Sequence, residues 1–428
     1  MNRIIDIFYV DKIHEFKQRM LNWVNQFSIC CFMDSHDYAD KYHKYDCIAA
    51  AGAYKFFSEN NDTLSKLKDF CKANKNEWIF GHLGYDLKNE IENLQSKHLN
   101  KIGFPDIYFF IPEVVLYLNN DKLTIHSIKR NPAKIFNEIT TQPFVNNKIS
   151  PEKNISITAA STEKDYIEII SKLQQHILRG DCYEINYCLE FFAENINVNP
   201  LSTYLKLLTI SPTPFSCFYK LDNKYLLCAS PERFLSKIND QIFSQPIKGT
   251  AARSKNANAD DLEKIRLFNN EKEKSENVMI VDLVRNDLSK ICKPASVEVE
   301  ELFGIYSFPQ VHQMISTVSG TLKDDISFAD IVKATFPMGS MTGAPKRSAM
   351  QLIEQYEKTK RQLYSGSVGY ISPENNFDFN VVIRSIFYNA DNRYLNFLVG
   401  SAITYYADAE KEYQECLLKA RAMREALE

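Results

Sequence analysis

The sequence lacks the patterns that mark a secreted or membrane-bound protein. No stretch approaches the ~18 uninterrupted apolar residues that a membrane-spanning helix needs. The short apolar run at the start is interrupted by Asp6 and Asp11, which is not typical of a signal peptide or an anchor. The ten cysteines include no Cys-x-x-Cys pair, and a chain of 428 residues can bury a core without disulfides. We therefore expect a cytoplasmic protein with reduced thiols.

The sequence also lacks an excess of charge of either sign. Lys and Arg total 51 and Asp and Glu total 54, which gives a formal net charge of −3. A protein that wraps nucleic acid usually shows a basic excess or a basic stripe, and this chain has neither. We therefore expect substrates and partners to be selected by local sites and not by net charge.

The clearest change in composition falls in residues 131–161. This stretch is polar, rich in Asn and punctuated by prolines, the last of them Pro151. Such a composition is typical of a connection between two regions. We expect an amino-terminal region at residues 1–158 and a catalytic region at residues 159–428.

Local patterns predict both helices and strands. Thr162 and Asp165 have the spacing of a helix capping box, and apolar residues then recur at helical intervals until Gly180. Long helical patterns cover residues 261–290 and 408–428. Runs of β-branched and aromatic residues predict strands over residues 224–230, 380–388 and 393–400. The expected fold class is α+β, with large and mostly antiparallel sheets.

Two Glu-x-x-Glu pairs lie on the long helical patterns. Glu273 and Glu276 share one helix face, as do Glu412 and Glu415. Such a spacing is most often a solvated acidic face. Carboxylates that converge from two helices can also bind Mg²⁺, which needs only one or two of them together with substrate oxygens and water.

Lys248 and Glu232 each allow a common and a chemical interpretation. Lys248 lies in the segment PIKGT, where a lysine is most often solvated but, if desolvated, can act as a nucleophile. Glu232 lies in SPERF, where it could be a turn carboxylate or, with a raised pKa, a general acid. A strand–turn–strand between the two could bring both side chains to one site.

Arg384 lies inside a predicted strand, where a buried charge requires a partner. That partner is more often a protein carboxylate, but it can be a ligand carboxylate gripped bidentately. Downstream, the small residues Gly400, Ser401 and Ala402 would let a ligand approach the backbone closely.

Taken in order, these segments resemble the chorismate-utilising family of anthranilate, aminodeoxychorismate, isochorismate and salicylate synthases. The resemblance covers most of the second half and extends more loosely to GHLGYDL at residues 81–87. The segments that carry it are GDCYEINY (180–187), SPERF, PIKGT, ENVMIVDLVRNDL (276–288), TFPMGSMTGAPK (335–346), SGSVGYIS (365–372), VIRS and EYQE (412–415). It implies a fold like that of anthranilate synthase component I, with antiparallel sheets packed as a sandwich.

The resemblance also implies an activity. Anthranilate synthases carry alanine where this chain has Lys248, whereas the aminodeoxychorismate synthases carry the lysine. On that basis Lys248 would attack ring carbon 2 of chorismate, Glu232 would protonate the departing 4-hydroxyl, and ammonia would add at carbon 4. The product would be 4-amino-4-deoxychorismate, a precursor of 4-aminobenzoate and folate.

The resemblance further implies the ligands of a metal and of the substrate. Glu276 and Glu415 match direct Mg²⁺ ligands, with Glu273 and Glu412 as outer or alternative ligands. The positions that match substrate-binding residues are Thr342, Tyr364, Arg384, Gly400, Ser401 and Ala402. Two departures stand out: the family's glycine triplet is Gly-Ser-Ala here, and Gln313 replaces a histidine that anthranilate-type enzymes tie to pyruvate loss.

A separate partner is implied as the source of ammonia. The chain has no Gly-x-Cys-x-Gly elbow of its own, and the family draws ammonia from a glutamine amidotransferase subunit. Two alternatives stay open: an anthranilate synthase large subunit, which Lys248 argues against, and a catalytically silent chorismate-binding subunit.

Overall fold

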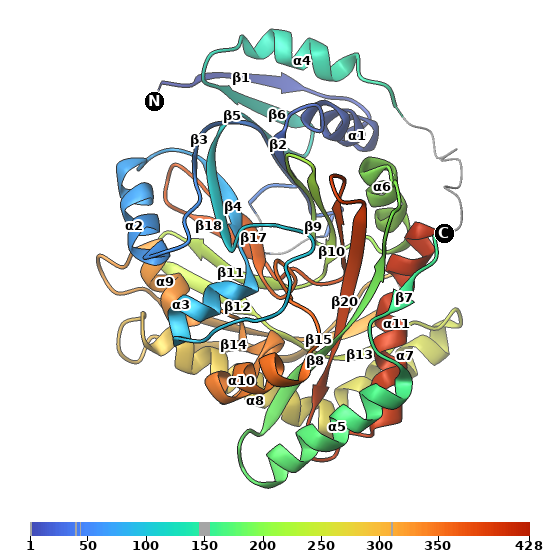
Figure 1. Ribbon diagram of the computed structural model, residues 1–428. Coiled ribbons are helices and arrows are strands. Elements are labelled where there is room, and N and C mark those ends of the chain that lie inside the picture. Colours follow the sequence, from blue (N-terminus) through green and yellow to red (C-terminus); the bar gives the residue numbers. More distant parts are fainter. Residues whose placement is uncertain (1, 39–40, 43, 145–154, 310) are drawn as a thin grey trace.

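The computed structural model describes residues 2–428, except 39–40, 43, 145–154 and 310. Antiparallel strands form its centre and helices lie on the outside (Figure 1). The strands of the first 160 residues are β1 Ile4–Tyr9, β2 Ile29–Asp34, β3 Cys47–Phe57, β4 Ile79–Leu83, β5 Ile107–Asn119, β6 Lys122–Ser127 and β7 Thr158–Ala159. The later strands are β8 Glu184–Ala193, β9 Phe215–Leu221, β10 Lys224–Ser230, β11 Arg233–Ile238, β12 Gln241–Gln245, β13 Ile247–Ala252, β14 Glu298–Ser307, β15 Val311–Thr321, β16 Gly343–Ala344, β17 Ser367–Ile371, β18 Phe377–Asn380, β19 Ser385–Asn389 and β20 Tyr394–Ile403.

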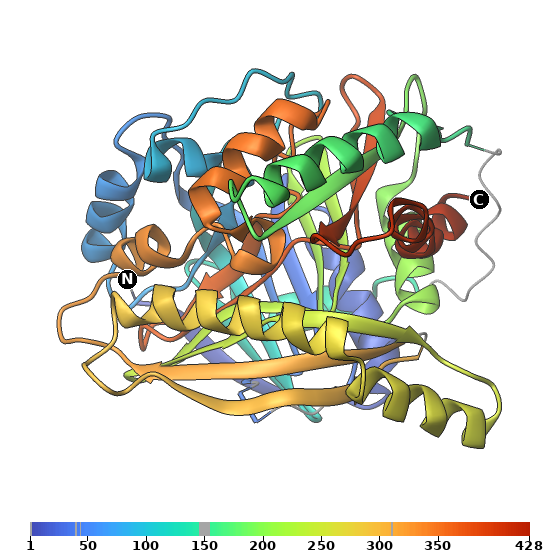
Figure 2. The same ribbon diagram turned by 90° about the horizontal axis from the view of Figure 1, so that it is seen from below.

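The helices cover the outside of these strands, as the view from below also shows (Figure 2). They are α1 Ile13–Val24, α2 Thr63–Ala73, α3 Lys88–Glu92, α4 Pro132–Thr140, α5 Glu163–Leu178, α6 Pro200–Ile210, α7 Ala257–Phe268, α8 Glu271–Ser289, α9 Phe328–Thr335, α10 Lys346–Tyr356 and α11 Ala409–Leu427. This arrangement confirms the predicted α+β class with large antiparallel sheets. Among the described residues, no helix has the length and apolar character needed to cross a membrane.

Strand pairing runs through the chain as one continuous antiparallel path. The order β8–β20–β19–β10–β9–β2–β3–β5 leads at β5 into β4–β17–β18–β11–β12–β15, because β5 pairs with both β3 and β4. Strands of the first 158 residues therefore lie between strands of the remainder. The boundary expected at residue 158 stays a prediction, but the regions on either side of it share one sheet.

Aromatic side chains pack against one another in the core of the fold. Phe191 of β8 stacks on Phe397 of β20 with ring centroids 5.2 Å apart. This contact joins two strands that both contribute residues to the cavity described below. Phe328 of α9 stacks on Phe379 of β18 at 5.1 Å. Full burial of one such side chain stabilises the fold by roughly 1.5–3 kcal/mol. Both hydrophobic clusters contain residues from before and after position 158, so the core spans both parts of the sequence.

Helix α5 begins and ends where the sequence predicts. The Thr162 hydroxyl accepts from the backbone N–H of Asp165 at 3.1 Å, and the Asp165 carboxylate accepts from the N–H of Thr162 at 3.2 Å. This capping box satisfies two of the donors that a helix start leaves free. After Leu178, Gly180 takes a φ of 85°, which ends the helix.

Three local predictions are wrong or incomplete. Residues 261–290 form two helices, because the Asn270 side chain accepts from two backbone N–H groups and starts α8 anew. Residues 380–388 are not one strand, because β18 ends at Asn380 and Arg384 has a left-handed φ of 51°. The connection at 131–161 begins with helix α4, and its part around Pro151 lies outside the described residues.

Candidate active site

One cavity gathers most of the residues that the sequence singles out. It is bounded by strands β13 and β20, helices α8 and α11, and the loops before β11 and β19. The predicted residues that line it are Glu232, Lys248, Glu273, Glu276, Tyr364, Arg384, Gly400, Ala402, Glu412 and Glu415. Predicted residues from position 232 to position 415 therefore face one space.

Lys248 enters this cavity as the second residue of β13. Its side chain is buried, and its Nζ donates to Oε1 of Glu184 on β8 at 2.5 Å. Burial lowers the pKa of Lys248, but the carboxylates of Glu184 and Glu276 raise it, and the net direction is upward. The amine is therefore protonated at neutral pH in this arrangement.

Glu232 faces the same cavity from the turn between β10 and β11. The backbone N–H of Glu232 donates to the Ser230 hydroxyl at 3.2 Å, and the Ser340 hydroxyl donates to Oε1 of Glu232 at 2.7 Å. Burial raises the pKa of Glu232 to about 7, against the opposing effects of Ser340 and Lys248. A carboxyl group with this pKa can hold and release a proton near neutrality.

The two Glu-x-x-Glu pairs converge on the cavity from α8 and α11. Glu276 lies four residues before Ile280, so both face inward toward the strands. Burial raises the pKa of Glu276 to about 7 and also raises the pKa values of Glu273 and Glu412. The pKa of Glu415 is lowered, chiefly by Lys419, whose Nζ lies 2.6 Å from its carboxylate.

The donor set of these helices fits a hard cation such as Mg²⁺. Oε1 of Glu276 is buried and has no hydrogen-bond partner among the residues that the structure describes, which leaves a carboxylate oxygen available in the cavity. Lys272 bridges the helices, with its Nζ 2.9 Å from Glu412 and 3.7 Å from Glu276. Within the described ranges, no three His, Cys, Asp or Glu side chains are arranged to hold an ion by themselves. Mg²⁺ needs only one or two carboxylates when substrate and water supply the rest.

Arg384 provides the cavity's cationic end. Its left-handed backbone sits just before β19, and the Arg384 carbonyl accepts from the N–H of Ala229 at 3.2 Å. No carboxylate in the described part of the chain forms an ion pair with its guanidinium, and burial lowers its pKa. Tyr364, which is buried, lines the cavity beside it. This arrangement favours a ligand carboxylate as the partner of Arg384.

Two of the predicted substrate-binding residues do not line the cavity. The Thr342 side chain is fully buried and its hydroxyl donates to the Met338 carbonyl at 3.1 Å. Ser401 points to the opposite face of β20, because side chains alternate along a strand, and it hydrogen-bonds to Tyr166 at 2.7 Å. Gly400 does line the cavity, and an added Cβ there would come within 2.4 Å of the Asn186 amide oxygen.

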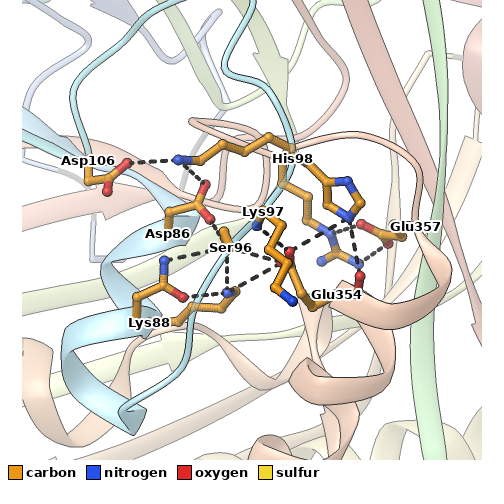
Figure 3. Close-up of polar contacts among 11 residues, drawn as sticks. Asp86, Lys88, Ser96, Lys97, His98, Asp106, Glu354 and Glu357 are labelled. Carbon is orange, nitrogen blue, oxygen red and sulfur yellow. Dashed lines mark hydrogen bonds and ion pairs between the residues drawn. The ribbon is translucent and has the colours of Figure 1, made fainter.

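A polar network links helix α10 to the GHLGYDL segment (Figure 3). The Ser96 hydroxyl lies 2.6 Å from a carboxylate oxygen of Asp86 and 3.0 Å from one of Glu354, which ties the segment after β4 to α10. Next to it, the fully buried Arg361 pairs with Glu357 and donates to the carbonyl of Asn186 on β8. Glu357 also accepts from the backbone N–H of Cys188, so this ion pair holds β8, which supplies Glu184.

Sequence reasoning missed several side chains that contact the predicted ones, four of which adjoin the charged groups of the cavity. These four are Glu184, Lys272, Ser340 and Lys419. Glu184 lies inside the matched segment GDCYEINY and Ser340 inside TFPMGSMTGAPK, so the resemblance marked their segments but not their contacts. Lys272 and Lys419 each lie four residues from a predicted glutamate, which is the spacing of a helical ion pair.

Comparison with known proteins identifies the family of this chain. The sequence profile of the chorismate binding enzymes matches residues 29–425. The chain belongs to this family. The match begins at β2, so it also takes in the amino-terminal strands, where the sequence alone shows only a loose resemblance.

Similar proteins in this family include aminodeoxychorismate synthases. The chain is 32% identical over 362 residues to aminodeoxychorismate synthase component 1 of Bacillus subtilis, covering 81% of this chain and 76% of that protein. It is 34% identical over 388 residues to the chloroplastic aminodeoxychorismate synthase of Arabidopsis thaliana, covering 84% of this chain but only 40% of the plant protein. The structure of anthranilate synthase component I from Streptococcus pneumoniae is similar in fold, with a TM-score of 0.77 and 24% identity over 90% of this chain and 93% of that one.

Proposed function

We propose that this chorismate binding enzyme aminates chorismate to 4-amino-4-deoxychorismate, using ammonia from a glutamine amidotransferase partner. The observation that carries the proposal is the buried amine of Lys248, which lines the same cavity as the carboxyl group of Glu232. A buried lysine beside a carboxyl group with a pKa of about 7 suits a covalent substitution with an acid-assisted leaving group. The names of the Bacillus and Arabidopsis relatives support the same reaction.

In this mechanism the replacement of the 4-hydroxyl by ammonia proceeds in two easier steps through a covalent adduct with Lys248. Arg384 binds one substrate carboxylate, and the neutral amine of Lys248 forms a bond to ring carbon 2 while the carbon–oxygen bond at carbon 4 breaks. Glu232 gives its proton to the departing hydroxyl, which leaves as water. Ammonia then bonds to carbon 4 and Lys248 leaves carbon 2 as a neutral amine. The new ammonium group returns one proton to Glu232, so chorismate and ammonia yield aminodeoxychorismate and water.

The acidic helices complete the proposal with a metal. Glu276 and Glu415 would hold Mg²⁺, with Glu273 and Glu412 as outer or alternative ligands. When bound there, the ion would supply positive charge to the ring carboxylate of the substrate. Thr342 and Ser401, whose side chains face away from the cavity, would contribute through the backbone of their segments.

A product assay tests the proposal. The purified chain is incubated with chorismate, Mg²⁺ and ammonium, and the products are separated by mass, with and without an added aminodeoxychorismate lyase. We expect a product that the lyase converts to 4-aminobenzoate, and we expect Lys248→Ala to abolish it. Lys255→Ala is the matched control, because Lys255 is exposed and lies on the loop that follows the same strand.

The other outcomes separate the alternatives. Anthranilate as the product would replace the proposal by the anthranilate synthase reaction. No turnover by the wild-type chain, with chorismate still bound, would indicate a silent binding subunit. Full activity of Lys248→Ala would refute the covalent role of the lysine even if the product is the expected one.

A further inference from the structure

The contact between Glu184 and Lys248 has no part in the mechanism above. Glu184 is the first residue of β8 and is 1% exposed. Its Oε1 accepts from Nζ of Lys248 at 2.5 Å, while its Oε2 is buried and has no hydrogen-bond partner within the described residues. A buried carboxylate with one unsatisfied oxygen is a costly arrangement, because it gives up its hydration on that side.

The same contact raises a chemical requirement. An amine attacks carbon only in its neutral form, and the Glu184 carboxylate helps to keep the Lys248 amine protonated. A proton acceptor must therefore take a proton from Nζ before the bond to carbon 2 forms. Moving that proton to Glu184 would also remove two charges from the interior, which lowers the desolvation cost of both groups.

Other carboxylates face Lys248, but none suits this step as well. Glu232, in the turn between β10 and β11, must keep its own proton for the leaving hydroxyl. Lys248 also interacts electrostatically with Glu273 and Glu276 on α8 and with Glu415 on α11, but it forms no ion pair with any of these three carboxylates. Of the carboxylates in the described residues, Glu184 is the one in hydrogen-bond contact with Nζ.

We propose that Glu184 is the catalytic base that accepts the proton of the Lys248 ammonium and so releases the nucleophile. The inference rests on the proposed function, because it assumes that Lys248 attacks the substrate. One proton moves from Nζ to the Glu184 carboxylate, and the neutral amine then forms the bond to carbon 2. When the amine leaves in the second step, the Glu184 carboxyl group returns the proton and restores the ion pair.

The test compares Glu184→Gln with wild type in a reaction without ammonia. The covalent adduct then accumulates on Lys248, and intact mass spectrometry follows its formation in single turnovers. We expect Glu184→Gln to form the adduct about 10²-fold more slowly at pH 7, with chorismate affinity little changed. The adduct rate of Glu184→Gln should approach that of wild type as the pH rises, because hydroxide then removes the Lys248 proton that the glutamine cannot accept.

Glu190→Gln is the matched control. Glu190 lies on the same strand, is 5% exposed, and accepts from Tyr394 and Asn396 away from the cavity. We expect it to form the adduct at the wild-type rate. A second variant, Glu184→Asp, keeps the carboxylate and should recover part of the lost rate, which a purely structural role would not predict.

Infrared difference spectra give an independent measurement. Adduct formation in the wild type should produce a new protonated-carboxyl band that is missing in Glu184→Gln and present in Glu190→Gln. If Glu184→Gln forms the adduct at a rate within about threefold of wild type at every pH, Glu184 is not the base. A threefold change is far smaller than the rate loss expected when a general base is removed. If the wild type itself forms no adduct and no aminodeoxychorismate, the proposed function fails instead.

Discussion

Replacing Glu232 by glutamine should damage the reaction and stabilise the fold at alkaline pH. Glutamine has nearly the same shape, and its oxygen can still accept from the Ser340 hydroxyl that contacts Glu232. The variant cannot protonate a leaving hydroxyl, so we expect kcat to fall by about 10²–10⁴-fold. It also never carries the charge that burial disfavours at this position.

The size of the stability change follows from the pKa. The pKa of Glu232 is about 7 in the folded chain and 4.5 as its ordinary value, and each tenfold change in proton affinity corresponds to about 1.4 kcal/mol. Between pH 4.5 and 7 the folded state binds more protons than the unfolded state, so the Glu232 contribution to stability falls as pH rises. Glu232→Gln should therefore match wild type near pH 4.5 and exceed it by up to about 3 kcal/mol above pH 7.

Urea unfolding at pH 5 and pH 8.5 measures this difference through the denaturation midpoint. Glu271→Gln serves as the control, because that carboxylate is 86% exposed at the start of α8 and burial does not disfavour its charge. A gain for Glu232→Gln that is equal at both pH values would refute the reasoning, because it would not come from ionisation. A loss of stability at pH 8.5 would refute it as well.

Three further predictions concern the surroundings of the site. Ser340→Ala removes a hydrogen bond that lowers the pKa of Glu232, so the alkaline limb of the pH–rate profile should move to higher pH. Thr162→Ala removes the α5 cap and should cost about 1 kcal/mol in urea unfolding, with kcat unchanged. Glu357→Gln leaves the buried Arg361 without its carboxylate and should cost about 3–5 kcal/mol, measured as a lower thermal midpoint.

Local signals explain which parts of the fold could be predicted from the sequence. The α5 cap and the run that forms β10 each depend on neighbours within a few residues, and both were predicted correctly. The break before α8 was missed because the Asn270 cap interrupts a pattern whose apolar spacing continues through it. The left-handed turn at Arg384 was missed because non-glycine residues rarely adopt it unless tertiary contacts hold them there.

The side-chain contacts within the site could not be predicted from the sequence, because they join residues far apart in the chain. The motifs marked Lys248, Glu232 and the glutamates of both helices, and the structure brings all of these to one cavity. The contact between Glu184 and Lys248 spans 64 positions, and that between Ser340 and Glu232 spans 108. Such contacts depend on which strands pair and in which register, and no local pattern encodes that.

The charges of the cavity give the physical reason for expecting a metal. Its lining carries the carboxyl groups of five glutamates against four cationic side chains. Lys272 and Lys419 pair with glutamates of α8 and α11, and Lys248 pairs with Glu184. Among the described lining residues, Arg384 is then the cation without an ion-pair partner. Chorismate has two carboxylates, and Arg384 can neutralise one of them. The other would face an acidic wall, and a divalent cation held between α8 and α11 would turn that repulsion into attraction.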